Sequence, residues 1–544
     1  MYIKRAALYL STCLITAPLV AWSAQEIIST GLPLRQALEQ SLCPVPVELP
    51  ARQRLQAFYT FLDHQPQWHD PERISQLTKQ LTELADDGLD PSEYLPVRQP
   101  SQAGSPLQQV CDEIRVSHTY LQALGHLRHG RYGRDGLEPL WRLDPKQEDV
   151  GQFLNQAVRG LEDLPGAFAE ARPDLPEYVA MRAYYARQRS EPLPRFEPVP
   201  AGPALNPGRL DSRVPLLRQR LFHAGYLPDP SVPPGIDANR YDPRLVDALT
   251  RFQEDHALEG DGVLGPATLS ELNIGPAQRR AQLRINLERL RWLADDRQPN
   301  QLVVDIAGGR LLLYRDGDLI WQTRTQVGRP DRATPQLASR INRVTLNPTW
   351  TVPPTILRED KLPSIRRDLG FLARNRMTVY DHKGRRLDPR AVNWSNPRGI
   401  LLRQAAGPSN PLGRVALRFD NPFAVYLHDT PSKRLFDEAQ RTFSSGCVRV
   451  ENAIGLTELL LMDGERERVT RLLNSGKTHE YRLERPLPIL MAYWTAEVGS
   501  DGRPRYRPDL YGLDAALHRA LTHHEPSPTV WNIAMGAATR DQRP

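Results

Sequence analysis

A proline-rich stretch at residues 191–207, EPLPRFEPVPAGPALNP, is the feature that most constrains how this chain folds. Its six prolines fix φ and lack N–H donors, so neither a helix nor an interior strand can run through it. We therefore predict a stiff linker over 191–209 that separates two parts of the chain. Because 544 residues are too many for one core, we expect about three or four domains.

Before the linker, the sequence has helical periodicity. RISQLTKQLTEL and LQQVCDEIRVSHTYLQAL each place apolar residues on one helical face, and Gly88 follows the first as a stop signal. We predict a helical scaffold domain over 34–190, with these stripes as its core. His126 and His129 have no third ligand at metal-binding spacing, so we expect neither a metal nor a cofactor.

The chain begins with the layout of a secretory signal peptide. Residues 1–24 combine a basic start, an apolar stretch and small residues before the expected cleavage site. We therefore expect the mature protein to lie in the periplasm. A retained N-terminal anchor in the inner membrane is the alternative, because the apolar stretch is close to the minimum length of a membrane span.

The charge balance is mildly positive. The formal charge of +6 falls to about +4 when Lys4 and Arg5 leave with the signal peptide. The basic residues do not gather into the clusters that nucleic acid requires, so we expect no nucleic-acid partner. A mild positive balance suits a protein that works near anionic polymers, although most such charge is solvated surface.

Residues 210–275 have the pattern of three short helices. VPLLRQRLFHAGYL and DPRLVDALTRFQEDHAL predict the first two, and DGVLGPATLSEL predicts a turn followed by the third. In these motifs the segment resembles the small three-helix peptidoglycan-binding domain. The helices themselves predict only a core, and the wall-binding role is what the resemblance implies. A further helix, RRAQLRINLERLRWL, carries a leucine stripe that we expect to pack onto the next domain.

After residue 298 the period changes from helix to strand. NQLVVDIAGGRLLLYRDGDLIWQTRTQVG predicts three strands joined by Gly-Gly and Asp-Gly turns. Residues 356–396 are basic and polar, which predicts an insertion that caps the sheet, and such insertions are often lids. We expect a mainly β catalytic domain over 298–485 and a C-terminal extension and tail over 486–544. The fold class is therefore multidomain α+β.

Cys447 lies in the segment RTFSSGCVRVEN and is a candidate nucleophile. A thiol becomes reactive when a nearby imidazole or helix terminus lowers its pKa below about 8.5. Cys447 follows Gly446, and a turn there places the N–H groups of both residues so that they can serve as an oxyanion hole. The following VENAIGLTELLL predicts a helix whose N-terminus favours a thiolate close by.

A histidine is the expected base for this thiol. Among His382, His428 and His479, only His428 ends an apolar strand pattern, FAVYLHD, from which a rigid scaffold can direct a side chain. A lone cysteine and a lone histidine form a weak signal on composition alone.

The segment HDTPSKRLFDEAQRTFSSGCVR resembles the signature of the YkuD-type L,D-transpeptidases. In that signature a histidine is followed, after a spacer, by Ser-His-Gly-Cys and then an arginine. His428, Ser444, Gly446, Cys447 and Arg449 match these positions, whereas Ser445 replaces the second histidine. Together with YWTAEVGSDGRPRYRPDLYGLD, the motifs resemble the large YcbB-like branch, which combines a helical scaffold, a wall-binding domain and a capping insertion.

The resemblance implies a two-step acyl transfer between two peptidoglycan tetrapeptide stems. Cys447 attacks the carbonyl of residue 3 in the donor stem, expels the terminal D-Ala and holds a thioester. The side-chain amine of residue 3 in the acceptor stem then resolves the thioester and forms a 3-3 cross-link. His428 transfers the protons. The resemblance also implies carbapenems as covalent inhibitors, and other cell-wall synthesis enzymes are candidate partners.

The resemblance assigns supporting roles to the neighbouring residues. The backbone carbonyl of Asp429 orients the His428 ring, and Gly446 and Ser445 support the oxyanion. Arg449 holds the site or a stem carboxylate, with a structural salt bridge as the alternative. We assign Tyr426, Trp350 and Ser444 to the substrate groove, and for the two aromatic residues core packing is the alternative.

Two other functions remain open at this stage. A hydrolase would use the same thioester but resolve it with water, as an L,D-carboxypeptidase or endopeptidase. A non-catalytic peptidoglycan-binding scaffold protein would keep the domains without turnover, and Ser445 leaves this alternative open.

Cys43 and Cys111 are the only other cysteines after the signal peptide, and we propose that they form a disulfide. An even pair in an oxidising compartment leaves Cys447 free. The alternative is that Cys111 is a buried small hydrophobe in its helical stripe.

Overall fold

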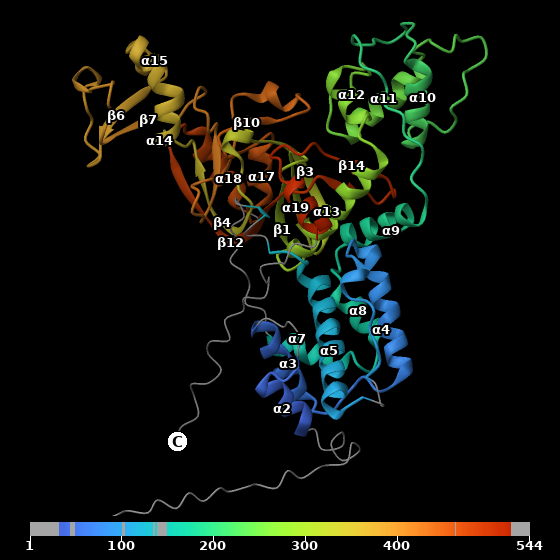
Figure 1. Ribbon diagram of the computed structural model, residues 1–544. Coiled ribbons are helices and arrows are strands. Elements are labelled where there is room, and N and C mark those ends of the chain that lie inside the picture. Colours follow the sequence, from blue (N-terminus) through green and yellow to red (C-terminus); the bar gives the residue numbers. More distant parts are fainter. Residues whose placement is uncertain are drawn as a thin grey trace, which may run out of the picture.

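The computed structural model describes residues 32–43, 49–100, 104–133, 137–138, 150–462 and 464–523. The predicted signal peptide, residues 1–24, lies outside this range. Three lobes extend from a central catalytic domain (Figure 1): the helical scaffold below it, the three-helix domain at one upper side and the capping insertion at the other. Within the described residues, no helix is both long enough and apolar enough to span a membrane.

The scaffold consists of helices, and all the described ones except α9 pack around one aromatic core. Its helices are α2 (Leu32–Gln40), α3 (Leu49–Phe61), α4 (Pro71–Glu83), α5 (Pro106–His129), α7 (Val150–Arg159), α8 (Leu164–Ala171) and α9 (Pro176–Ser190). Helix α5 begins where the Oγ of Ser105 accepts a hydrogen bond from the Gln108 amide and Pro106 presets φ. Phe58, Trp68 and Tyr120 are completely buried in the core. The structure joins Cys43 to Cys111, 68 residues apart, and leaves Cys447 free.

The three predicted helices of the next domain are present. They are α10 (Val214–His223), α11 (Pro243–Asp255) and α12 (Pro266–Leu272). Contrary to what its prolines predict, the linker before them is not separate from this domain along its whole length. Val199 and Leu205 pack into the core of this domain, and the Val199 amide donates to Asn273 Oδ1 at 2.8 Å. The second half of 191–209 is therefore part of the domain, because its apolar side chains find a core there.

The catalytic domain is a sheet that closes on itself. Its strands are β1 (Gln301–Asp305), β2 (Arg310–Arg315), β3 (Asp318–Gly328), β4 (Leu337–Leu346), β8 (Val415–Phe419), β9 (Leu427–His428), β10 (Thr442–Ser444), β11 (Val448–Val450) and β12 (His479–Ala492). They are ordered β10-β3-β11-β9-β8-β4-β12-β1-β2, and β2 also pairs with β3. Helices α17 (Ala453–Leu459) and α18 (Glu465–Asn474) contribute Leu456 and Leu473 to the enclosed core.

Strand β12 corrects the predicted end of the catalytic domain. A boundary at 485 falls inside this strand, which runs to Ala492 and lies between β4 and β1. Its last residues are almost fully buried, whereas its first half alternates between buried and exposed positions. The extension proper follows as β13 (Ala496–Val498), β14 (Pro504–Tyr506) and α19 (Asp514–His523).

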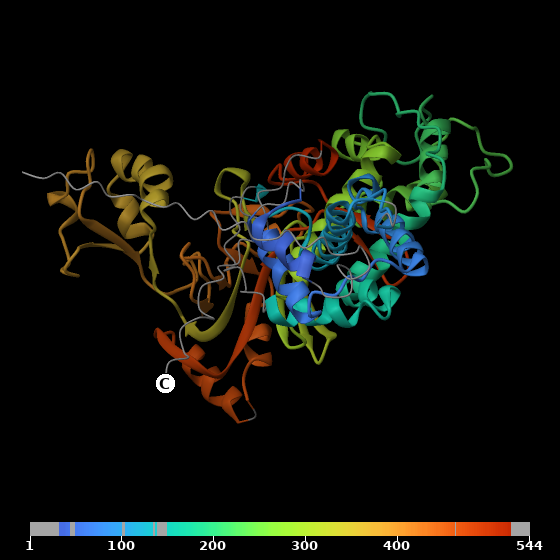
Figure 2. The ribbon, with the colours of Figure 1, turned by 60° about the horizontal axis from the view of Figure 1, so that its bottom comes forward.

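The capping insertion is a small subdomain with its own core, wider than the predicted range 356–396. A three-stranded sheet of β5 (Trp350–Thr351), β7 (Ile400–Gln404) and β6 (Met377–Asp381) packs against α14 (Pro354–Ile356), a π-helical turn (Leu357–Lys361), α15 (Leu362–Arg367) and α16 (Gly370–Arg374). Leu362, Val379 and Leu402 lie in its core. The subdomain is set apart from the closed sheet in both views (Figures 1 and 2). The short apolar segments escaped the sequence analysis because basic residues surround them.

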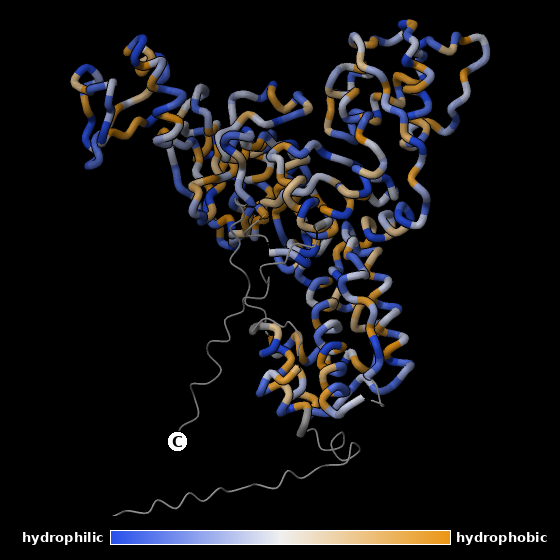
Figure 3. Tube along the Cα trace, in the orientation of Figure 1, coloured by the Kyte–Doolittle hydropathy of each residue, from blue (hydrophilic) through white to orange (hydrophobic). Residues whose placement is uncertain are grey.

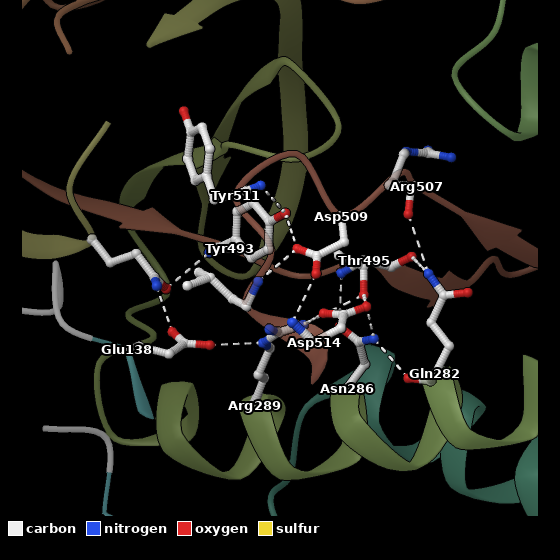
Figure 4. Close-up of polar contacts among 12 residues, drawn as sticks. Glu138, Gln282, Asn286, Arg289, Tyr493, Thr495, Arg507, Asp509, Tyr511 and Asp514 are labelled. Atoms are coloured by element: carbon white, nitrogen blue, oxygen red, sulfur yellow. Dashed lines mark hydrogen bonds and ion pairs between the residues drawn. The ribbon is translucent and has the colours of Figure 1, made fainter. Parts of the chain in front are cut away.

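Helix α13 (Pro276–Ala294) lies where scaffold, catalytic domain and extension meet. The leucine stripe packs as expected, since Leu283, Leu287 and Leu290 contact residues of α9 and of the β13–β14 hairpin. The opposite face is also buried, although it is charged. Arg289 pairs with Glu138 at 2.8 Å and with Asp514 at 2.6 Å, and all three appear in Figure 4. In the hydropathy trace of Figure 3 this junction mixes apolar and polar segments.

The first prediction concerns the Cys43–Cys111 disulfide. Denatured, non-reduced mature protein should show one reactive thiol, and after reduction it should show three. Replacing both cysteines by serine should lower the stability of the scaffold by up to ~4 kcal/mol, because the bond closes a long loop in the unfolded chain. Three thiols before reduction would contradict the pairing.

Candidate active site

The register of β9 and β11 brings the predicted dyad onto one face of the sheet. These strands are parallel, with Val448 opposite Leu427 and Arg449 opposite His428. Leu427, Val448 and Val450 are completely buried in the enclosed core. Because side chains alternate along a strand, the residues between them lie on the outer face. His428 and Cys447 are therefore diagonal neighbours on that face.

His428 is held in a form that can accept a proton. Its ring is buried, and Nδ1 lies 2.5 Å from the backbone carbonyl oxygen of Asp429. A carbonyl can only accept, so Nδ1 carries the hydrogen and Nε2 is left as the acceptor. Burial lowers the pKa of His428 to about 4; the positive charges of Arg449 and Arg418 add to this, and the Asp429 carbonyl opposes it. The imidazole is therefore neutral near pH 7.

The Cys447 thiol is protonated in the resting site. Burial raises its pKa above the ordinary value, and a backbone hydrogen bond from Tyr426 and the charges of Arg418 and Arg449 partly offset this effect. The helix predicted over VENAIGLTELLL is present as α17, but strand β11 lies between Cys447 and its first residue, Ala453. The charges that lower the pKa of Cys447 come from Arg418 on β8 and Arg449 on β11.

The loop before Cys447 is held by its own hydrogen bonds. Ser444 Oγ donates to the Cys447 carbonyl at 2.5 Å and accepts the Gly446 amide at 3.2 Å. Gly446 has φ +105°, a conformation that favours glycine. The Gly446 amide is therefore already engaged, and our expectation that it forms half of an oxyanion hole is wrong for this arrangement. Ser444 is also assigned to this loop rather than to the substrate groove.

A second layer fixes the same loop from outside. Thr334 Oγ1 donates to the Gly446 carbonyl at 3.0 Å and accepts from the Gly328 amide at 2.8 Å. The Tyr511 hydroxyl then donates to the Gly328 carbonyl at 2.9 Å and accepts from the Thr334 amide at 3.2 Å. Tyr511 lies in the stretch YRPDLYGLD, but the sequence alone did not indicate a role for it. Tyr511 stacks on Tyr493, as Figure 4 shows.

Ser445, where the signature has a histidine, is joined to the capping insertion. Arg332 Nη1 donates to Ser445 Oγ at 3.0 Å. The same guanidinium pairs with Glu359 at 2.6 Å and with Asp360 at 2.9 Å, both in the π-helical turn of the insertion. We call Arg332, Glu359, Asp360 and Ser445 the cap contact. It connects the loop that carries Cys447 to the insertion.

Asp429 and Arg449 make hydrogen bonds that hold the strand ending at His428 and the strand that begins directly after Cys447. The Asp429 carboxylate accepts from the Arg414 amide at 2.9 Å and pairs with Lys433 at 2.7 Å, so its side chain fixes the strand end while its carbonyl orients His428. Arg449 donates to Gln326 Oε1 at 3.0 Å. Within the described chain no carboxylate pairs with Arg449, which disfavours the salt-bridge alternative.

The two aromatic residues proposed for the groove differ in position. Tyr426 is partly exposed, and its ring centroid lies 5.6 Å from that of His428. Trp350 is 7% exposed and packs in the core of the capping insertion, so core packing is the alternative that the structure favours for it. His382 directly follows β6 in the insertion, and His479 begins β12. Neither β6 nor β12 pairs with β11.

Comparisons with known proteins match three parts of the chain. Three family models match: YkuD, the L,D-transpeptidase catalytic domain, over residues 299–469; Scaffold, the scaffold domain, over 53–184; and PG_binding_1, "Putative peptidoglycan binding domain", over 211–272. The chain therefore carries an L,D-transpeptidase catalytic domain of the YkuD type together with a scaffold domain and a peptidoglycan-binding domain.

A curated Haemophilus influenzae protein named "Putative L,D-transpeptidase" is 35% identical over 244 residues. The match covers 44% of this chain and 49% of that protein, so the chain spans about half the length of this relative. A solved L,D-transpeptidase (residues 123–326) from Xylanimonas cellulosilytica is 17% identical with a TM-score of 0.18, covering 54% of this chain and 100% of that one. One from Mycobacterium smegmatis is 14% identical with a TM-score of 0.16, covering 35% and 57%.

The second prediction follows from the protonation of the dyad. Because the pKa of Cys447 is raised and that of His428 is lowered, both groups are neutral near pH 7. The rate of Cys447 alkylation by iodoacetamide should therefore rise by about tenfold per pH unit between about pH 6 and pH 8. A plateau across this range would indicate a preformed thiolate–imidazolium pair and contradict the assignment. Cys447→Ala should remove the labelling.

Proposed function

We propose that this protein is an L,D-transpeptidase that forms 3-3 cross-links between peptidoglycan tetrapeptide stems through a Cys447 thioester. The observation that carries the proposal is the common outer face of Cys447 and His428, with the Nδ1 of His428 held by the Asp429 carbonyl. This arrangement leaves a proton acceptor beside a neutral thiol. The family match of residues 299–469 supports the same reaction class.

In the first half-reaction the donor stem acylates Cys447. As Sγ attacks the carbonyl carbon of residue 3, the thiol proton passes to His428 Nε2. The carbonyl oxygen gains negative charge, and the Cys447 amide is the donor available for it, since it makes no hydrogen bond to any other described residue. When the tetrahedral centre collapses, His428 returns the proton to the leaving D-Ala amine and a thioester remains.

In the second half-reaction the acceptor amine resolves the thioester. The nitrogen attacks the thioester carbon and loses a proton to His428, the carbon–sulfur bond breaks, and the proton returns to the Cys447 sulfur. An amide bond between two residues at position 3 results. Water in place of the amine would give an L,D-carboxypeptidase or endopeptidase by the same steps, and a chain without turnover would be a wall-binding scaffold protein.

The remaining domains fit work at the cell wall. We assign residues 211–272, which match a peptidoglycan-binding family, to holding the enzyme on its polymer. We propose that the mature protein lies in the periplasm, because residues 1–24 have the layout of a signal peptide. Carbapenems, as analogues of the acyl donor, should acylate Cys447, and other cell-wall synthesis enzymes are candidate partners.

The third prediction tests this function with purified protein and soluble tetrapeptide stems. Mass spectrometry should find a 3-3 cross-linked dimer and free D-Ala. Cys447→Ala should give neither, and His428→Ala should be at least ~100-fold slower, because a general base typically contributes on that scale. His382→Ala is the matched control and should keep full activity. A tripeptide as the sole product would instead identify a hydrolase, and no product from the unaltered chain would identify a non-catalytic protein.

The fourth prediction concerns the cap contact, which we propose holds the insertion as a lid over the site. Glu359→Gln combined with Asp360→Asn removes both ion pairs to Arg332. Each such pair contributes up to ~1 kcal/mol, so amide hydrogen exchange over 357–367 should accelerate severalfold. Acylation of Cys447 by a carbapenem should slow the same exchange in the unaltered chain.

Asp368→Asn is the control for that measurement, because it breaks an exposed pair with Arg374 inside the same insertion without touching Arg332. It should leave exchange at the π-helical turn unchanged. Equal exchange in all three proteins would show that the cap contact does not hold the insertion.

A further inference from the structure

A row of arginines leads across the outer face of the sheet to Cys447. Strand register places Arg482 of β12 opposite Arg343 of β4, and Arg343 opposite Arg418 of β8. In the antiparallel β8–β9 pair Leu417 lies opposite Leu427, so Arg418 lies opposite Tyr426. The β9–β11 register then places Tyr426 beside Cys447. We call Arg418, Arg343 and Arg482 the arginine row.

Contacts within the row agree with this register. The guanidinium carbon of Arg418 lies 3.9 Å from the centre of the Tyr426 ring. Tyr426 therefore lies between the arginine row and Cys447. The charge of Arg418 also acts on both dyad members, since it lowers the pKa of Cys447 and of His428. Arg418 is therefore close to the reacting atoms, and Arg343 and Arg482 continue outward from it.

The row is electrostatically unfavourable as it stands. Like charges directly opposite each other on neighbouring strands destabilise a sheet. Among the described residues, no carboxylate forms an ion pair with any of these three arginines. Glu480 instead accepts a hydrogen bond from Thr345 Oγ1 at 2.9 Å, and Thr345 Oγ1 accepts one from Arg418 Nε at 3.4 Å. Three stacked cations that form no ion pair with a described residue have a role if an anion binds over them.

The row also borders an open pocket. A pocket of about 390 Å³ is lined by Arg343, Arg418 and Glu480. Arg343 and Arg482 are exposed, and Arg418 is partly exposed, so all three can be reached from solvent. The surface therefore combines space, access and positive charge next to the nucleophile.

We propose that the arginine row binds the free carboxylates of the peptidoglycan stem whose carbonyl reacts with Cys447. Neighbouring strands are about 4.8 Å apart, so the row begins about 10 Å from Cys447 and ends about 19 Å away. An extended peptide advances about 3.3 Å per residue, so a tetrapeptide stem of about 13 Å that starts at Cys447 passes Arg418 and approaches Arg343, about 14 Å away, whereas Arg482 lies beyond it. Arg418 and Arg343 take stem carboxylates within this reach, and Arg482 adds positive charge at the far end of the row. This assignment rests on the proposed function and names the part of the surface that selects its substrate.

Binding should be measured on full-length protein with Cys447→Ala, which cannot turn over. The ligands are a soluble tetrapeptide with free carboxylates and the same peptide with its carboxylates amidated. Arg343→Gln should weaken binding of the free peptide by about tenfold, the usual scale for a charge-assisted hydrogen bond. Arg482→Gln should weaken it less, because Arg482 lies beyond the reach of the stem. Arg343→Lys should recover part of the affinity, because it keeps the charge but not the bidentate geometry. Binding of the amidated peptide should not change among these variants.

Arg340→Gln is the matched control, because Arg340 is exposed on the same strand but lies opposite Pro488, outside the row. It should bind the free peptide as the parent does. Unchanged binding in Arg343→Gln would overturn the proposal, as would an equal loss for both peptides. Displacement of the peptide by inorganic phosphate at matched ionic strength would identify a general anion surface and also overturn it.

The outcome for the row can be separated from that of the proposed function. Cross-linking or hydrolysis by the unaltered chain is read from products, whereas the row is read from peptide binding in the inactive variant. Arginine variants that keep Cys447 and show native melting temperatures and unchanged alkylation of Cys447 by iodoacetamide would show that the fold and the thiol are intact. A loss of peptide binding by the same arginine substitutions in the Cys447→Ala protein then reports on the row alone.

Discussion

The burial of Arg289 is the interaction on which the rest of the architecture depends. A guanidinium loses several kcal/mol of solvation when it leaves water, and only well-placed carboxylates offset this cost. Glu138 comes from the scaffold side of the junction and Asp514 from the C-terminal extension, so both partners must arrive for the charge to be neutralised. Because the charge of Arg289 must be neutralised from both sides, helix α13 holds the scaffold, the catalytic domain and the C-terminal extension together. Removal of either acid would leave a buried charge short of a partner, which typically costs 3–5 kcal/mol.

Contacts continue from the same junction through Tyr493 and Tyr511 (Figure 4) toward the loop that carries Cys447. Glu138 also contacts Gln336, which accepts the Tyr493 amide, and the Tyr493 hydroxyl donates to Asp509. Tyr511, stacked on Tyr493, then reaches Thr334, which holds the Gly446 carbonyl. The backbone that presents Cys447 is thus supported by residues outside the catalytic domain. This support explains why the extension is packed against the domain rather than left as a tail.

Sequence patterns predicted the parts of the fold that depend on local chemistry. Helical periodicity, the Gly-Gly and Asp-Gly turns and the strand ending at His428 are all present, because each follows from neighbouring residues. Alternation along a strand is also a local property, and it is what places His428 on the outer face. The Cys43–Cys111 pairing followed from counting cysteines.

Features that depend on distant partners were not predictable. The hydrogen bond that engages the Gly446 amide was missed because the loop geometry, rather than the glycine itself, directs it to Ser444. The place of β12 in the centre of the sheet, the core of the capping insertion and the contact between Arg332 and Ser445 all require knowledge of which segments meet. The arginine row is visible only once three registers are known, since its members are separated by up to 139 residues in sequence.

The central position of β12 has a consequence for the order in which the chain matures. Segments that leave a ribosome or a translocation channel emerge from the N-terminus first, and β12 follows every other strand of the closed sheet. Until it inserts between β4 and β1, the sheet has two open edges and the residues beneath it remain in contact with water. His428 and Cys447 will already have emerged by then, but the support from Tyr493 and Tyr511 comes later still. Chain order therefore delays the assembly of the surroundings of Cys447 until synthesis is nearly finished.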